Sequence, residues 1–368
     1  MDKSSIAFLK ELIEVRKMNI NELLKKKGIE SKNDYSFLEN DKETMNNLLY
    51  IVLSGSLAYG TEVYNEDGSL KSDIDIRIIR MNNKNEILLM DQNKIQTNVE
   101  TDTSIFKINQ IIKMFANANP NVLEFLGSED RNGLYIHPYF KENILKNKHL
   151  FLTKRIYFSF GGFMRSQINR FNNKINRTDE QTIIENLMRS IEKANNHLEE
   201  EYGMKIGKEV IVNPENKLFE VVIAKDLSLN VLPQFLNEFS TMCKNAKKLN
   251  EINKNQKYVL DHGRINKHIC HYIRLANMGK ELLLTGEINT YRKDDHDLLM
   301  SIRNNENGVW LDKNDIPTDK LNKLVEEKEK ELLNAYDKCK LPERVDEEAL
   351  NKLIIKINKD IITDSWKN

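Results

Sequence analysis

Two short segments with strand patterns stand close together near the beginning of the chain. Residues 48–53 form a continuous apolar run with the length and β-branched content of a buried strand. Residues 73–78 alternate between polar and apolar positions, which is typical of a strand with one buried face. Because side chains alternate along a strand, Asp73, Asp75 and Arg77 are predicted to share one face, opposite three isoleucines.

The next apolar segments predict a hairpin. Residues 87–90 and 95–99 read as two strands joined by a polar turn at residues 91–94. If the second strand stays extended, Glu100 and Asp102 continue it and lie on one face. The sequence therefore offers a third carboxylate, from either residue, on a neighbouring strand.

A helix is predicted to follow this hairpin. Thr103 or Ser104 caps it, and its apolar side carries Ile105, Ile108, Ile112 and Phe115. Pro120 ends the helix, because the residue before a proline disfavours the helical region. Residues 122–126 then form a short apolar turn of helix that carries Glu124. Two interpretations of Glu124 stay open, since it either reaches the face of the aspartates or forms a surface salt bridge.

Helical patterns dominate both ends of the chain. A helix capped at Asn19 is expected to end at Gly28, after an earlier helix that begins at Ser4 or Ser5. From about residue 154, the longer patterns predict helices at 156–175, 180–202, 232–249, 266–285 and 319–333, with two short strands at 209–212 and 219–223. The two glycines inside the first of these helices, Gly161 and Gly162, suggest the close approach of another backbone.

Composition narrows the class of protein. Of 368 residues, 56 are Lys or Arg and 56 are Asp or Glu, so a nucleic-acid surface requires a local basic patch. The three cysteines have no paired spacing, which argues against a disulfide framework or a zinc site and fits a reducing cytosol. No apolar run approaches the ~20 residues of a membrane helix. We therefore expect a cytoplasmic protein without a signal peptide.

The first strand pair carries the most specific chemistry. Asp73 and Asp75 repel each other on an exposed strand face unless a cation lies between them, and a divalent metal ion is the natural resident. Gly55 and Ser56 leave the preceding strand, at a point where a glycine lets backbone amides approach a phosphate closely.

A second polar surface is predicted on the helix at 266–285. Lys267, His271 and Arg274 follow spacings of four and three residues, so they line one helix face that suits a triphosphate or an RNA backbone. The alternative is a polar face packed against acidic residues elsewhere. Tyr291, Arg292 and Arg303 are candidates to extend the surface.

Several of these segments resemble a known family. The run Gly55-Ser-x-x-Tyr-Gly-Thr61, followed by Ser72-Asp-Ile-Asp75, resembles the DNA polymerase β-like nucleotidyltransferase superfamily, and most closely its RlaP-type (YcgL-like) predicted nucleotidyltransferases of bacteria and phages. Residues 102–106 and 119–126 form a second matching block, and residues 267–303 form a third. The resemblance spans roughly residues 48 to 310.

The resemblance implies an α+β fold, with a palm-like mixed sheet and helices followed by a mostly helical C-terminal domain. It implies that Asp73, Asp75 and Asp102 bind two Mg²⁺ or Mn²⁺ ions, with Glu100 as the alternative third carboxylate. Gly55, Ser56, Tyr59 and Gly60 are implied to contact the nucleotide, helped by Lys267, His271 and Arg274. We expect four regions, namely a helical extension (1–46), a catalytic domain (47–150), a helical domain with a small β insertion near 207–225 (151–310), and a helical tail (311–368).

The implied activity is metal-dependent nucleotidyl transfer. A nucleoside monophosphate moves from a nucleoside triphosphate to an acceptor hydroxyl, with release of pyrophosphate, and the acceptor is expected to be an RNA or tRNA end. Nucleotidylation of a protein or a small molecule is the alternative within the enzyme class, and a non-catalytic nucleotide- or RNA-binding protein is the alternative outside it. One departure from the family pattern is the longer connection at residues 63–71, which bears on the choice of nucleotide or acceptor.

Overall fold

The computed structural model describes residues 19–89, 95–175, 177–204, 230–258, 263–313 and 316–367. The chain divides into two compact units, one of Met1–Gln167 with Cys270–Asn368 and one of Ile168–Ile269. This division cuts the chain differently from the four regions expected from sequence, because the unit boundaries fall inside helices α11 (Arg155–Ile175) and α15 (Gly263–Thr285). Among the described residues, no helix is both long and apolar enough to cross a membrane.

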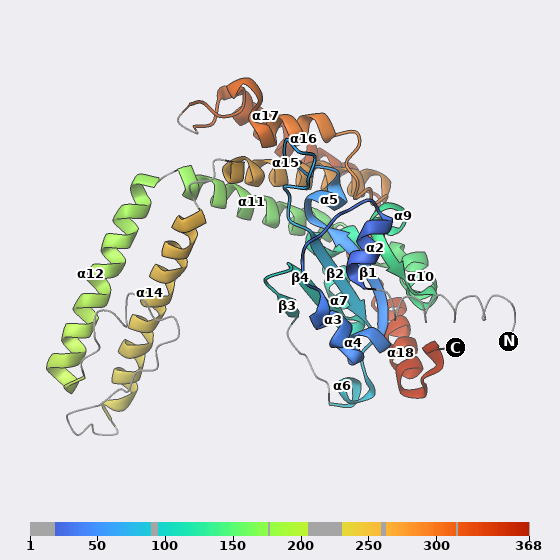
Figure 1. The fold of residues 1–368 in the computed structure, drawn as a ribbon, viewed down its shortest axis with the longest axis horizontal. Coiled ribbons are helices and arrows are strands. Elements are labelled where there is room, and N and C mark those ends of the chain that lie inside the picture. The colour runs from blue at the N-terminus through green and yellow to red at the C-terminus, as the bar shows by residue number, and fades with distance from the viewer. Residues whose placement is uncertain are drawn as a thin grey trace, which may run out of the picture. The chain divides into compact units, whose positions relative to one another are not determined.

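A mixed sheet forms the centre of the first unit (Figure 1). In the described part of the chain it has five strands in the order β3-β4-β2-β1-β5. Their bounds are β1 Leu48–Ser54, β2 Asp75–Arg80, β3 Gln96–Asn98, β4 Thr103–Lys107 and β5 Gly133–Ile136. Strand β2 runs parallel to β4, and the other neighbouring strands are antiparallel. The sheet and its helices confirm the α+β fold class.

The first unit also contains helices and 3₁₀ turns. Their bounds are α2 Ile20–Lys26, α3 Ser36–Asn40, α4 Lys42–Asn46, α5 Gly55–Tyr59, α6 Lys84–Leu88, α7 Ile108–Ala116, α8 Pro120–Leu123, α9 Glu129–Asn132, α10 Pro138–Asn143, α16 His296–Asn304, α17 Asp319–Lys338 and α18 Glu347–Thr363, with 3₁₀ turns at Glu124–Gly127, Leu145–Phe151, Glu306–Gly308 and Ser365–Lys367. The break predicted at Pro120 is confirmed, because Pro120 is the first residue of α8.

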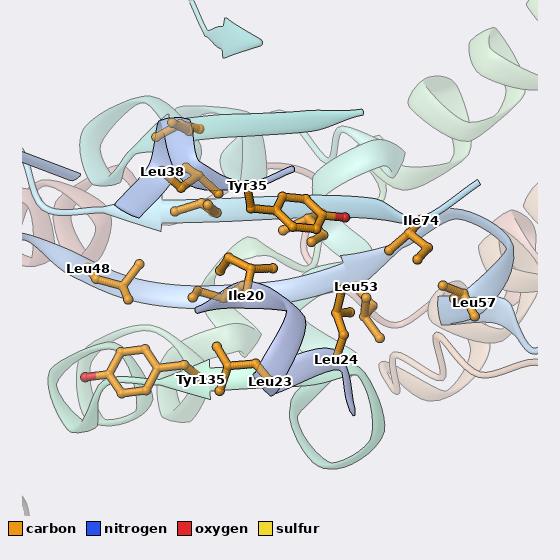
Figure 2. Close-up of a cluster of buried hydrophobic side chains, with 14 residues drawn as sticks. Ile20, Leu23, Leu24, Tyr35, Leu38, Leu48, Leu53, Leu57, Ile74 and Tyr135 are labelled. Atoms are coloured by element: carbon orange, nitrogen blue, oxygen red, sulfur yellow. The ribbon is translucent and has the colours of Figure 1, made fainter. Parts of the chain in front are cut away.

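Helix α2 covers one face of the sheet. Figure 2 shows Ile20, Leu23 and Leu24 of α2 beside Leu48 and Leu53 of β1 in one buried cluster. Ile74, Ile76 and Ile78 belong to the same cluster, so the isoleucine face predicted for this strand is the buried one. The predicted cap is also confirmed, since the Asn19 side chain accepts a hydrogen bond from the Glu22 amide. The helix expected near residues 4–13 lies outside the described residues.

The first arm of the predicted hairpin is wrong. Residues 84–88 form helix α6, because the Asn83 side chain caps it and the Glu86 carboxylate accepts a hydrogen bond from the Asn83 amide. This capping box favours a helix over the strand that the apolar run 87–90 suggests. The second arm is confirmed in part by β3, which pairs with β4.

The segment after β3 also differs from expectation. Glu100 and Asp102 do not continue an extended strand, because the chain turns there and Asp102 adopts a left-handed φ of 43°. Residues 103–107 then form β4 instead of opening a helix, and α7 begins only at Ile108. Pairing of the whole length of β4 with residues 76–80 of β2 stabilises an extended backbone here, and this tertiary interaction overrides the local helix pattern.

The second unit contains two long helices that pack together, α12 (Arg177–Tyr202) and α14 (Leu232–Tyr258) (Figure 1). Their shared core includes Leu198, Tyr202, Phe235 and Met242. The helices predicted at 180–202 and 232–249 are therefore confirmed, and the strands predicted at 209–212 and 219–223 lie outside the described residues. The interpretation of Gly161 and Gly162 is wrong, since a Cβ on either glycine has no described atom within 4 Å.

Candidate active site

The site begins where strand β1 ends. Ser54 pairs with Asp75 across the β1–β2 ladder, and Gly55 then turns the chain into α5 with a left-handed φ of 63°. A Cβ on Gly55 would lie 1.9 Å from Oδ2 of Asp75. Glycine is therefore required twice here, for the backbone conformation and for the close approach of the carboxylate.

One guanidinium joins two of the predicted carboxylates. Nη2 of Arg77 lies 3.3 Å from Oδ1 of Asp75, and Nη1 lies 3.3 Å from Oδ1 of Asp102. Nη1 also donates to the backbone carbonyl oxygen of Asp102 at 2.6 Å. The side chains of Asp75 and Arg77 are 17% and 19% exposed, and that of Asp102 is 56% exposed. Two acids thus share one base, and the cluster has an excess of negative charge at a partly open position.

The strands explain why Asp75 and Asp102 meet. Ile76 of β2 pairs with Thr103 of β4 in the parallel ladder, so Asp75 and Asp102, the residues just before them, become neighbours. The Ile76 amide donates to the Asp102 carbonyl oxygen at 3.2 Å, which fixes the turn that carries Asp102. Glu100 lies in the exposed turn before it. This geometry favours Asp102 over Glu100 as the partner of Asp75.

Asp73 occupies a different place from the other two carboxylates. It lies before the first residue of β2 and is exposed, so it does not share the regular strand face that the alternation predicts. The residue before it, Ser72, accepts a hydrogen bond from Nη2 of Arg303 at 3.3 Å. Burial lowers the pKa of Arg303, and the charge of Asp73 acts in the opposite direction. Within the residues that the structure describes, no three Asp, Glu, His or Cys side chains form a group that could hold a metal ion. The metal-binding role of Asp73 stays a prediction.

The buried carboxylate of Glu124 is hydrogen-bonded to both ends of the Gly55 turn. Glu124 is 2% exposed, and its Oε1 accepts a hydrogen bond from the Ser54 hydroxyl at 3.0 Å. Its Oε2 accepts from the Tyr59 hydroxyl at 2.8 Å and from Nη1 of Arg274 at 3.4 Å. Glu124 is therefore not the surface salt bridge that remained an alternative. It ties both ends of the segment from Ser54 to Tyr59 to the rest of the unit.

Arg274 completes this buried network. Its guanidinium lies 3.7 Å from the centre of the Tyr59 ring, and the His271 ring approaches the same tyrosine edge-on at 6.4 Å. Burial raises the pKa of Glu124, and the positive charge of Arg274 opposes this shift. Burial also raises the pKa of Tyr59 well above its usual value, so its hydroxyl keeps the proton that it donates to Glu124. For Arg274 the structure favours the alternative of packing against an acid.

The remaining residues predicted to bind nucleotide lie in varied surroundings. Ser56 is almost fully buried, and its carbonyl oxygen accepts a hydrogen bond from the Thr61 amide. Gly60 has a left-handed φ of 74° and lies against the Tyr291 ring, which a Cβ would meet at 2.1 Å. Lys267 is an exposed residue of the second unit. The binding roles of Gly55, Ser56, Tyr59, Gly60, Lys267, His271 and Arg274 stay predictions.

The arginines expected to extend the polar surface have protein partners. Arg292 contacts the carboxylates of Glu281 and Asp295 at 2.6 and 2.5 Å. Arg303 donates to the carbonyl oxygen of Thr61 and to the Ser72 hydroxyl. These contacts hold the two ends of the lengthened connection, and a bridge between Tyr64 and Leu70 folds it into a small hairpin.

The donor set at Asp75 and Asp102 fits a divalent metal ion. Carboxylate oxygens are the hard ligands that Mg²⁺ prefers, and Mg²⁺ is commonly held by one or two carboxylates together with substrate phosphates and water. A positive group, the Arg77 guanidinium, already lies between these two carboxylates. The same position therefore suits a metal cation electrostatically.

Comparison with known proteins agrees with this geometry. The family model RlaP, described as the RNA repair pathway DNA polymerase beta family, matches residues 21–188. No curated protein matches the chain, and no solved structure does. The matched segment contains Gly55, Asp75, Asp102 and Glu124, together with the whole sheet on which they meet. Through this segment, the chain is similar to the RNA repair pathway DNA polymerase beta family.

Proposed function

We propose that this protein is a metal-dependent nucleotidyltransferase that transfers a nucleoside monophosphate from a nucleoside triphosphate to an acceptor hydroxyl. The similarity of residues 21–188 to the RlaP family supports a polymerase beta-like nucleotidyltransferase connected with RNA repair. The observation that carries the more specific proposal is the meeting of Asp75 and Asp102 at a partly exposed edge, next to the Gly55 turn. A protein that only binds RNA has no need for two acids held at one position.

The proposed metal ligands are Asp75 and Asp102, with Asp73 as the third carboxylate implied by the family. When bound, Mg²⁺ or Mn²⁺ ions would stabilise the charge on the attacking and leaving oxygens of the phosphoryl group. The excess negative charge of the carboxylates gives these ions their electrostatic reason to bind here.

The protein groups would act by positioning and by accepting a proton. Because Gly55 has no side chain, the Asp75 carboxylate lies directly against the turn, which would bring a metal-bound triphosphate close to the backbone. The carboxylate of Asp102, the more exposed of the pair, would accept the proton of the acceptor hydroxyl. The acceptor oxygen would then form a bond to the α-phosphorus as the bond to pyrophosphate breaks.

The proposed acceptor is an RNA or tRNA end. The description of the family as an RNA repair family supports this choice. The formal net charge of +0 gives no general attraction to nucleic acid, so RNA binding would depend on local basic groups.

The test incubates the full chain with each of four α-labelled nucleoside triphosphates, Mg²⁺ or Mn²⁺, and a small-RNA pool. Label is followed into RNA and into protein, for the natural sequence and for Asp75→Asn. Label in RNA that depends on Asp75 supports the proposal and identifies the nucleotide. Label in protein alone moves the acceptor to a protein. Triphosphate binding without label in RNA or protein contradicts an RNA acceptor and points to a small-molecule acceptor or a non-catalytic binding role.

A further inference from the structure

Arg77 lies between the two carboxylates of the proposed metal site. Its guanidinium is 3.3 Å from each carboxylate, one through each terminal nitrogen. Two carboxylates and one guanidinium sum to a charge of −1, so the arginine neutralises half of the negative charge. A divalent cation held by these two carboxylates would compete with the guanidinium for their negative charge.

The contacts of Arg77 with the carboxylates are loose. Charge-assisted hydrogen bonds between nitrogen and oxygen usually measure about 2.7–2.9 Å. The two carboxylate contacts of Arg77 are longer, and its shortest contact, 2.6 Å, is to the neutral backbone carbonyl oxygen of Asp102. The carboxylates can therefore exchange partners while the guanidinium keeps its anchor on the backbone. The backbone itself is held by Ile76 and Ile78, which are fully buried on either side of Arg77.

We propose that Arg77 is a positioning residue that occupies Asp75 and Asp102 in the absence of substrate and competes with the divalent cation for them. Replacing the guanidinium by one divalent ion would change the local charge from −1 to 0, whereas keeping both cations at the carboxylates would leave it at +1. A triphosphate relieves the repulsion between the guanidinium and the divalent ion, because its negative charge can pair with the guanidinium when the carboxylates bind the metal. Divalent cations should therefore bind weakly alone and strongly together with the triphosphate. This inference rests on the proposed function for its metal ion.

The test measures Mn²⁺ binding to the full chain without nucleotide, from the electron paramagnetic resonance signal of free Mn²⁺. Arg77→Met removes the competing charge and keeps a side chain of similar length, and we expect it to bind Mn²⁺ about tenfold more tightly than the natural sequence. The double variant Asp75→Asn, Arg77→Met should lose this gain, which locates the ion. As a control, Arg155→Met removes an exposed arginine on α11 and should leave the affinity unchanged.

A second variant keeps the test decisive if Arg77→Met does not fold. Lysine is a point charge that cannot span both carboxylates, so Arg77→Lys should give an intermediate affinity for Mn²⁺. A folded Met or Lys variant that binds Mn²⁺ no more tightly than the natural sequence overturns the inference, even if Asp75-dependent transfer is found. Absence of Mn²⁺ binding in every variant, with or without triphosphate, contradicts both the inference and the proposed metal site.

Discussion

The two ends of strand β2 carry ionic clusters that differ in charge balance and in burial. At the Arg80 end, Glu86 lies 2.7 Å from Arg80 and 2.8 Å from Lys107, and these side chains are 9%, 4% and 8% exposed. Nη2 of Arg80 also lies 3.4 Å from the exposed Glu43 carboxylate, so two bases meet two acids there. At the Asp75 end, one arginine lies between two acids at 3.3 Å, and one of these acids is mostly exposed. Each cluster joins β2 to the segment of β4 beside it.

The difference separates a structural cluster from a candidate functional one. Short contacts and burial at the Arg80 end show that the charges there satisfy one another and fasten α6 to the sheet. Exposed ion pairs contribute little to stability, so the long contact of Arg77 with the mostly exposed Asp102 gives the Asp75 end little structural value. Its excess negative charge is instead available to a ligand. If this comparison is right, substitutions at the two ends will change different properties.

The largest effect on stability is expected from Glu86→Ala. It leaves Arg80 and Lys107, two buried cations and register partners, without their shared acid. Breaking a buried ionic group in this way costs about 3–5 kcal/mol, to be measured by urea unfolding. The control is Glu142→Ala, which removes an exposed acid paired with Lys146 and should cost less than about 1 kcal/mol. Equal costs for the two variants would refute the structural role of the Arg80 end.

The same cluster predicts a pH dependence of stability. Burial of Glu86 raises its pKa, but hydrogen bonds from Arg80, Lys107 and the Asn83 amide lower it more, to about 2. Because the folded-state pKa lies below the ordinary value of 4.5, the stabilisation is complete above pH 4.5 and is lost as the pH falls toward 2. The loss is on the order of 3 kcal/mol.

Comparing Glu86→Gln with the natural sequence isolates the contribution of Glu86 ionisation to stability, since the other acids titrate alike in the two proteins. The difference in unfolding free energy between the natural sequence and Glu86→Gln should shrink as the pH falls from about 5 to about 2. This range spans the ordinary pKa of 4.5 and the folded-state pKa of about 2 of Glu86. A difference that stays constant over this range would show that Glu86 keeps an ordinary pKa.

A smaller loss of stability, with a large loss of transfer, is expected from Gly55→Ala. The left-handed backbone costs about 1–3 kcal/mol for a residue with a Cβ, and the new methyl group displaces the Asp75 carboxylate. Gly68→Ala is the matched control, because Gly68 has a φ of 81° and no described atom within 4 Å of its Cβ position. Both variants should lose similar stability in urea unfolding. If Gly68→Ala abolishes transfer as well, close approach to Asp75 is not the reason that Gly55 is needed.

The smallest stability effect is expected from Asp102→Asn. The variant removes a charge from an exposed ion pair and relieves repulsion with Asp75, so the net change should stay below about 1 kcal/mol. Urea unfolding measures it. A cost above about 2 kcal/mol would mean that the Asp75 end is a structural cluster like the Arg80 end.

Local sequence patterns predict the helices and strands that are determined by residues close to them in the sequence. Strands β1 and β2, the break at Pro120 and the long helices after residue 154 all follow from apolar periodicity and from caps or breakers. Helix α6 was missed although its signal is local, because the apolar run 87–90 outweighed the capping pair of Asn83 and Glu86. Strand β4 could not be predicted in this way, since only its pairing with β2 makes it extended.

The candidate site shows the same limit. The pair Asp73 and Asp75 and the Gly55 turn carry a recognisable spacing, and Asp102 was identified through the family resemblance. The partners of Glu124 are 70, 65 and 150 residues away in the sequence, so no local pattern reveals that this carboxylate is buried beneath the turn. Its position as the one charged residue in the apolar run 122–126 was the available signal.

The most direct test compares nucleotidyl transfer by Asp75→Asn and Glu86→Gln, with each rate expressed per folded molecule at pH 7. We predict that Asp75→Asn remains folded and loses roughly 100-fold or more in rate, because it removes an electrostatic group from the reacting centre. Glu86→Gln should be less stable and yet transfer label at nearly the natural rate. If folded Asp75→Asn transferred label at the rate of the natural sequence, this would contradict the assignment of the active site to the Asp75 end of β2.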